Sequence, residues 1–217
     1  PQTDYYAFVA TLDPSIGWNN AFTTFQVKHP NNSGSPYKTS VSPLLTIDDQ
    51  GDYYMSIEID NSSNSGIYID QQQFVSFSSW GYNTLGSVLV KYDSTGNYLW
   101  HSKTTQFSPT SIDFTINQLL LYGDYGSRFN SAAYNVATEA LGVTDAWSHS
   151  NLVKSHGYKD AAILSFNSVG NLNWIESIGG DDVDLSIAMA VKNCGKDIYL
   201  AGVSPTGNVN CFNDSLN

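Results

Sequence analysis

The sequence predicts an all-β protein built of about three repeat units with four antiparallel strands each. Two observations carry this prediction: a composition that favours strands and turns, and a segment that recurs at a fixed distance along the chain. The 217 residues include 14 Tyr and 17 Gly, whereas only 13% are charged. Aromatic residues are enriched in strands, and glycine supplies the turns between them. A chain of this length buries about 70% of the surface that its unfolded form exposes, which suffices for a core.

The recurring segment is Ser87–Trp100, which returns in near copy as Ala161–Trp174. The copies align without gaps at an offset of 74 residues, so that Trp100 falls on Trp174. Each copy predicts a strand, a tight turn that contains Gly-Asn, and a second strand. A fixed period of this kind indicates a repeat architecture.

The first unit, residues 4–60, is a diverged copy. Its first hairpin is predicted from strands at Tyr6–Leu12 and Trp18–Val27, on either side of an Asp-Pro-Ser turn. A polar stretch from His29 to Ser42 then predicts a surface loop. The second hairpin of the unit comprises Leu44–Asp48 and Tyr53–Ile59.

The second and third units, residues 61–124 and 125–217, each end in a copy of that second hairpin. Its strands are expected at Ile112–Ile116 with Leu119–Gly123, and at Ile187–Val191 with Asp197–Gly202. Further strands are predicted at Gly66–Asp70 and Phe74–Phe77, whereas Asp124–Lys159 predicts an irregular loop. No linker of the kind that separates independent domains occurs, so residues 1–217 are expected to form a single domain.

Three stretches of the chain carry a family resemblance: Tyr5–Asp13, Val88–Trp100 and Asp160–Gly202. In the last of these, Ile178-Gly179-Gly180-Asp181-Asp182 supplies a Gly-Gly step between the hairpins. In this order the pieces resemble the propeller-type repeats of bacterial secreted and surface proteins, often called SBBP repeats. The resemblance implies a β-propeller-like array in which each unit is one blade. It says almost nothing about activity, because the matching residues are turn and core positions.

Three units are too few to close a propeller, which usually has 4 to 8 blades. Three outcomes are therefore expected as alternatives. The chain belongs to a longer protein, another copy or domain completes the ring, or the sheets form an open stack. In each case the sheet edges of the three units invite pairing with other strands.

The net charge of −11, with only nine Lys and Arg, excludes several partners. Nucleic acid requires a basic face, anionic membranes repel an acidic protein, and no apolar run is long enough to cross a bilayer. We therefore expect no nucleic-acid partner and no membrane insertion. Position 1 is Pro rather than Met, which predicts a processed form or a fragment. The low charge content favours an extracellular or cell-surface location.

Covalent features are predicted at five positions. Pairing of Cys194 with Cys211 closes a loop of about 18 residues, for which the chain-entropy model gives roughly 3 kcal/mol. The alternative is a pair of buried free thiols. Asn31, Asn61 and Asn213 begin Asn-x-Ser sequons, which are glycosylation acceptors in secreted proteins and also arise by chance in an Asn-rich chain.

Two features predict ligand binding. Asp181, Asp182 and Asp184 bring three carboxylates into one loop, which suits a structural calcium ion, although Asp also caps solvated turns. No other cofactor is expected. Trp80 and Trp147 lie in polar stretches beside hydrogen-bonding side chains, an arrangement that suits stacking on sugars. The alternative for both tryptophans is packing of a loop onto the blades.

The sequence contains no nucleophile elbow, phosphate-binding loop or spaced histidine ligands, so we expect no catalytic residues. The prediction is a non-enzymatic extracellular or cell-surface protein with a structural or adhesive role, which self-assembles through open sheet edges into a homo-oligomer or filament. The alternative is a carbohydrate-binding module with glycan partners. A third hypothesis, a propeller glycoside hydrolase, requires two of Glu58, Glu139 and Glu176 to form a carboxylate pair.

Overall fold

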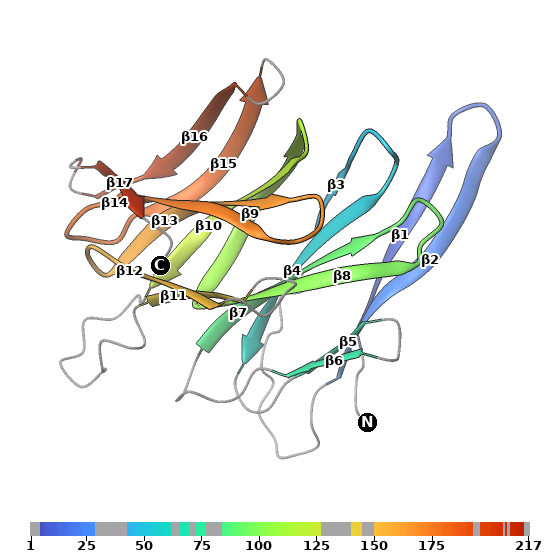
Figure 1. Ribbon diagram of the computed structural model, residues 1–217, viewed down its shortest axis with the longest axis horizontal. Helices are drawn as coiled ribbons and strands as arrows, with labels where there is room; N and C mark the ends of the chain where they lie inside the picture. The colour runs from blue at the N-terminus through green and yellow to red at the C-terminus, as the bar shows by residue number, and fades with distance from the viewer. Residues whose placement is uncertain are drawn as a thin grey trace.

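The computed structural model describes residues 5–28, 43–61, 66–69, 73–76, 84–126, 140–144, 150–192, 196–205, 207 and 209–214. All regular structure in these residues is β-strand, in four antiparallel sheets that stack in a row across the molecule (Figure 1). No helix occurs in the described ranges, and hence none with the length and apolar character that crossing a bilayer requires. The all-β prediction is confirmed, and no closed barrel or ring forms among the described strands.

The first and second sheets hold the strands of residues 5–105 and two strands from residues 140–154. The first sheet has the order β1-β2-β5-β6, with strands Tyr5–Asp13, Gly17–Lys28, Gly66–Ile69 and Gln73–Ser76. The second sheet has the order β3-β4-β7-β8-β11-β12, with strands Leu44–Ile47, Tyr53–Asn61, Thr84–Tyr92, Tyr98–Thr105, Ala140–Thr144 and Ser150–Lys154.

The third and fourth sheets hold the C-terminal half. The third sheet has the order β9-β10-β13-β14-β17, with strands Phe107–Thr115, Gln118–Gly126, Lys159–Asn167, Leu172–Gly179 and Asn210–Asp214. The fourth sheet contains only β15 and β16, strands Leu185–Lys192 and Asp197–Val203. The strands predicted from alternation and turn residues are therefore present.

Each central sheet joins hairpins from different predicted units. In the second sheet, β4 from the first unit pairs with β7 from the second, and Tyr53 lies opposite Tyr92. In the third sheet, β10 from the second unit pairs with β13 from the third, and Leu119 lies opposite Phe166. Because Tyr92 and Phe166 are the aligned residues of the 74-residue repeat, the two sheets share one register. The physical unit is thus the second hairpin of one repeat joined to the first hairpin of the next.

The hairpin turns repeat as well. Oδ1 of Asp93 accepts the backbone N–H groups of Thr95 and Asn97, both at 2.9 Å. Oδ1 of Asn167 accepts the corresponding N–H groups two and four residues later, at 3.1 and 2.9 Å. Gly96 and Gly170 follow at positive φ, 92° and 89°, where a side chain would be strained. The Gly-Asn turns predicted from the repeat are confirmed.

Buried side chains fill each gap between successive sheets. The first and second sheets enclose Ala7, Val9, Met55, Ile57, Ile69, Val88, Val90 and Tyr92. The cluster between the second and third sheets is the largest and includes Tyr54, Leu89, Phe107, Leu119, Leu121, Leu141, Val143, Ala162, Leu164 and Phe166. Between the third and fourth sheets lie Leu120, Tyr122, Ala161 and Ile163, with Met189, Ile198 and Leu200 against them. Adjacent residues of a central strand therefore face different neighbouring sheets.

Two regions differ from the sequence prediction. The segment from residue 124 to residue 159, expected to be an irregular loop, contains β11 and β12, which extend the second sheet beyond β8. Strand β17 was also missed, and it extends the third sheet beyond β14. Both additions occupy the place that β5 and β6 occupy beyond β2 in the first sheet. After each second hairpin, the chain returns to extend the preceding sheet.

Candidate functional site

Two aspartates are buried at the end of the third sheet. Asp160, at the start of β13, is 0% exposed, and Asp184, just before β15, is 5% exposed. The His156 N–H donates to Oδ2 of Asp160 at 2.6 Å, and the Gly180 N–H donates to Oδ2 of Asp184 at 2.7 Å. Within the described part of the chain, Oδ1 of each aspartate has no hydrogen-bond partner. Burial, together with the nearby Asp184 charge, raises the pKa of Asp160.

Glycines make this arrangement sterically feasible. A Cβ atom on Gly179 would collide with the Asp160 carboxylate, and one on Gly157 would collide with the carbonyl of Gly180. The Asp184 N–H donates to the Lys159 carbonyl at 2.5 Å, which fixes the loop before β15 against the start of β13. The Gly-Gly step of the repeat therefore serves close packing around Asp160.

A buried ion pair lies beside the two aspartates. Nζ of Lys159 is 2.5 Å from Oδ2 of Asp124, and both side chains are almost fully enclosed. The other oxygen of Asp124 accepts the N–H of Ser186, whose hydroxyl lies 2.9 Å from that of Thr110. Asp124 lies on β10 and Ser186 on β15, so these contacts join the third sheet to the fourth.

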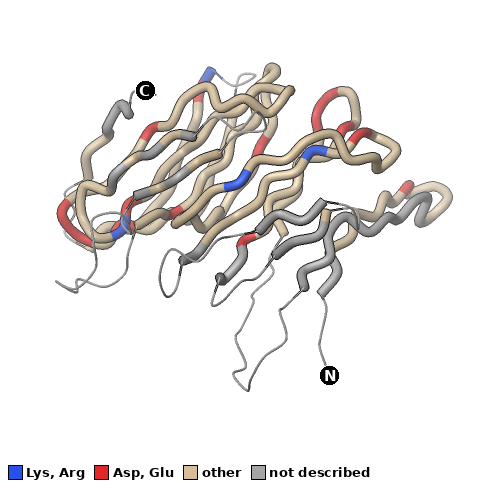
Figure 2. The backbone as a smooth tube through the Cα atoms, turned by 60° about the horizontal axis from the view of Figure 1, so that its bottom comes forward, with Lys and Arg blue, Asp and Glu red and all other residues tan. Residues whose placement is uncertain are grey.

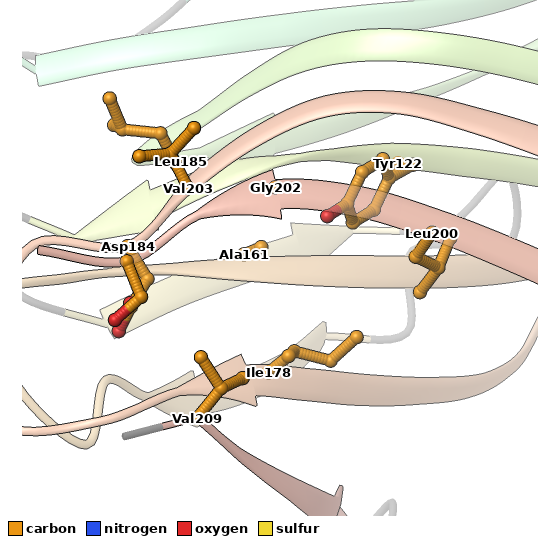
Figure 3. A pocket seen from close by; sticks show the side chains of 10 residues that line it. Tyr122, Ala161, Ile178, Asp184, Leu185, Leu200, Gly202, Val203 and Val209 are labelled. Carbon is orange, nitrogen blue, oxygen red and sulfur yellow. The ribbon is translucent and has the colours of Figure 1, made fainter. Parts of the chain in front are cut away.

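A cavity of about 190 Å³ opens between the third and fourth sheets. Asp184 lies toward one end and Tyr122 and Leu200 toward the other, with aliphatic side chains between them (Figure 3). The Tyr122 hydroxyl donates to the Ala201 carbonyl at 3.2 Å, and burial raises the pKa of Tyr122 to about 12. Most of the described lining residues are aliphatic, so much of the cavity wall is apolar.

A second buried polar cluster lies at the turn between β3 and β4. Asp48 accepts the N–H groups of Gln50 and Asp52 at 3.0 and 2.9 Å, and the Tyr54 hydroxyl donates to its other oxygen at 3.0 Å. Nζ of Lys91 lies 2.9 Å from Asp52 and 3.4 Å from Asp48. Burial raises the pKa of Tyr54 to about 12. All four charged or phenolic groups have partners, which is the pattern of a structural cluster.

The three predicted calcium ligands lie in different surroundings. Asp181 is exposed, Asp182 accepts the N–H of its neighbour Val183, and Asp184 is buried beside Asp160. In the described ranges no group of three or more His, Cys, Asp or Glu side chains is placed to hold a metal ion. Calcium at this loop stays a prediction. Sequence reasoning missed Asp160, although a charged residue directly before an apolar strand was a usable signal.

Half of the remaining predicted residues lie outside the described ranges. Trp80, Trp147, Cys194, Asn31 and Glu139 are all outside them. Cys211 carries an exposed free thiol, and no disulfide forms among the described residues. Asn61 ends β4 and Asn213 lies in β17. Glu58 accepts a hydrogen bond from the Ser108 hydroxyl, and Glu176 lies in β14. The sugar-binding, disulfide, glycosylation and glycosidase hypotheses all stay predictions.

In the part of the chain that the structure describes, both ends of the stack finish in a strand with one unpaired edge. Among the described strands, β1 pairs only with β2, and β16 pairs only with β15. The outer face of the first sheet exposes Phe8 (68%) and Leu12, and that of the fourth sheet exposes Tyr199 (57%). Val203, at the end of β16, is also exposed. Several Asp and Glu residues lie at turns (Figure 2), whereas the sequences of β1 and β16 are largely apolar. Unpaired edges with apolar faces are sites for strand addition.

Comparisons with protein-family models, with curated proteins and with solved structures give no significant match.

Proposed function

We propose that this chain is a non-enzymatic structural or adhesive module of the cell surface or extracellular space, in which the stacked sheets act as successive blades of a propeller-like array. The observation that carries the proposal is the pair of open ends, β1 at one end of the stack and β16 at the other. A soluble protein that functions alone usually protects such edges by charges, prolines or covering loops. Here the edges are flanked by exposed Phe8, Leu12, Tyr199 and Val203.

The buried polar groups support a structural role. The Lys159–Asp124 pair is enclosed, the Lys91–Asp52 pair is largely buried, and each links neighbouring hairpins. A composition with 13% charged residues supports an extracellular location. In a structural module of this kind, copies of the chain associate with one another through the unpaired edges of β1 and β16.

Static light scattering over a concentration series tests the proposal. We expect the apparent mass to rise with concentration above that of the 23.8 kDa chain. A single mass of one chain across the whole series, in high as well as low salt, would refute self-association. Hydrolysis of a polysaccharide panel by the purified protein would refute the non-enzymatic assignment.

A further inference from the structure

We propose that the fourth sheet of one copy pairs with the first sheet of a second copy, β16 alongside β1, to form one continuous six-stranded sheet. The inference rests on the structural role proposed above and names the partner of its open edges: a second copy of this chain. Three features of the fold carry it, namely strand order, register and the orientation of side chains.

Strand order shows that the first sheet is an incomplete form of the second. The second sheet consists of the hairpin β3-β4, the hairpin β7-β8 and the added hairpin β11-β12. The first sheet contains β1-β2 and the added hairpin β5-β6, and lacks the hairpin that would precede β1. The fourth sheet, β15-β16, is a hairpin of the missing type, because it aligns with β9-β10 in the repeat. Joining the fourth sheet of one copy to the first sheet of another gives the order β15-β16-β1-β2-β5-β6. This order has the same succession of hairpins as the second sheet.

The register of the proposed joint follows from the second and third sheets, in which a second hairpin already pairs with the first hairpin of the next repeat. Gly123 lies opposite Ala162 in the third sheet. Gly202 is the repeat counterpart of Gly123, since both close the apolar run of the second hairpin. Phe8 is the counterpart of Ala162, because each stands the same number of residues before the turn residue that ends its strand. That turn residue is Asp13 in β1 and Asn167 in β13. The joint therefore places Phe8 of the second copy opposite Gly202 of the first, and Thr11 opposite Tyr199.

Side-chain orientation agrees with this joint. In the third sheet, Ala162 and Leu164 face the preceding sheet, whereas Ala161 and Ile163 face the following one. In β1, Ala7 and Val9 are buried against the second sheet, which follows it. Phe8 and Leu12 then point toward the position of a preceding sheet, and both are exposed in the single chain. A preceding sheet from another copy would cover them.

The cavity between the third and fourth sheets lies where this joint needs room. Gly202 lines it, together with Tyr122, Ile178 and Val203. Opposite Gly202, the Phe8 ring of the second copy would face the third sheet of the first copy and enter this opening. An aromatic ring in an apolar cavity of about 190 Å³ is the kind of buried anchor that dominates interface energies.

The two edges lie at opposite ends of the stack, so a single chain cannot join them to itself (Figure 1). A head-to-tail contact of this type leaves one free β1 and one free β16 on every dimer. Such a heterologous interface grows into a closed ring or into a filament.

Cysteine cross-linking between two variants tests the register. We mix Tyr199→Cys with Thr11→Cys under mild oxidation; residues directly opposite in an antiparallel pair have Cα atoms about 4.5 to 5.5 Å apart, within disulfide range. The matched control mixes Tyr199→Cys with Leu12→Cys, one residue along, whose side chain points to the other face. Peptide mass spectrometry identifies the 11–199 linkage, and each variant alone reports cross-links through the native cysteines.

Charge substitution tests the anchor. Phe8→Asp places a carboxylate in the proposed cavity and is expected to weaken association at least about tenfold, because a buried charge needs a partner. Val169→Asp, on the turn between β13 and β14, adds the same charge at another exposed apolar residue and is expected to change association less than about twofold. Circular dichroism of both variants checks that the fold is retained.

The outcomes separate this inference from the proposed function. The 11–199 linkage in the mixture, absent with Leu12→Cys, supports the joint. If light scattering shows association but the 11–199 linkage is missing, the joint is overturned and self-association remains. The same holds if Phe8→Asp and Val169→Asp weaken association equally. A single chain at every concentration overturns both.

Discussion

Asp48 offers a sharp test of the buried polar cluster at the turn between β3 and β4. Replacing it by Asn preserves the turn, since Asn167 accepts the same pair of backbone N–H groups in the turn between β13 and β14. The substitution removes the oxygen that accepts the Tyr54 hydroxyl and the charge 3.4 Å from Lys91. Both Tyr54 and Lys91 are buried, so neither gains water in exchange.

The expected cost is about 2 kcal/mol in the free energy of unfolding. A buried hydroxyl whose proton loses its acceptor costs about 1 to 3 kcal/mol, and Lys91 keeps Asp52 at 2.9 Å, which limits the electrostatic loss. Asp93→Asn is the matched control. Its turn is the same, but its second oxygen accepts only the exposed Asn97 amide, so a cost within about 0.5 kcal/mol is expected.

Urea denaturation followed by tryptophan fluorescence measures both variants. A double-mutant cycle with Tyr54→Phe isolates the hydroxyl contact, because Asp48→Asn should cost at least about 1 kcal/mol less when the hydroxyl is already absent. Equal losses for Asp48→Asn and Asp93→Asn would refute the reasoning. So would a cycle without coupling between positions 48 and 54.

Three further predictions concern pH, packing and salt. Since burial raises the pKa of folded Asp160, the folded state binds more protons than the unfolded one, and stability declines as pH rises from about 4 through that pKa. Asp160→Asn is therefore expected to stabilise the protein at neutral pH by an amount that shrinks in acid. A stability difference from the native protein that does not depend on pH in urea titrations would contradict this. Gly123→Ala is expected to destabilise by about 1 to 3 kcal/mol or more, because the new Cβ would collide with the Ser108 carbonyl and lie 2.7 Å from the Phe107 ring; an unchanged thermal midpoint would contradict it. Since each copy carries a net charge of −11, raising salt from 0.05 to about 0.5 M is expected to strengthen self-association by screening the repulsion, and weaker scattering in high salt would count against an apolar joint.

The repeat was readable from the sequence because its signals are local. Gly96 and Gly170 mark turns that need positive φ, and the strands on either side alternate or run apolar over a few residues. These features fix hairpins, and the hairpins are present in the structure. The sequence did not reveal how hairpins pair, because Tyr53 opposite Tyr92 is a contact between separate units. Periodicity identifies the length of a repeat but not where the folded unit begins.

The missed elements have the same cause. Strand Ala140–Thr144 is short and lies in a polar segment, and its pairing with β8 through Gly142 and Thr105 is a tertiary contact rather than a propensity. At the candidate site, Asp184 was predicted from its acidic loop. Its burial beside Asp160 depends on the close approach of Gly157 to Gly180, which no local pattern encodes.

The joining of hairpins from successive repeats has a consequence for synthesis on the ribosome. The hairpin β3-β4 is complete at Asn61, but its partner β7 begins only at Thr84 and β8 ends at Thr105. At roughly 5 to 20 residues per second, β4 waits a few seconds with an unpaired edge. The same delay recurs between β10 and β13. Nascent chains of this protein thus pass repeatedly through half-built sheets, and a chaperone that shields strand edges would act during those intervals.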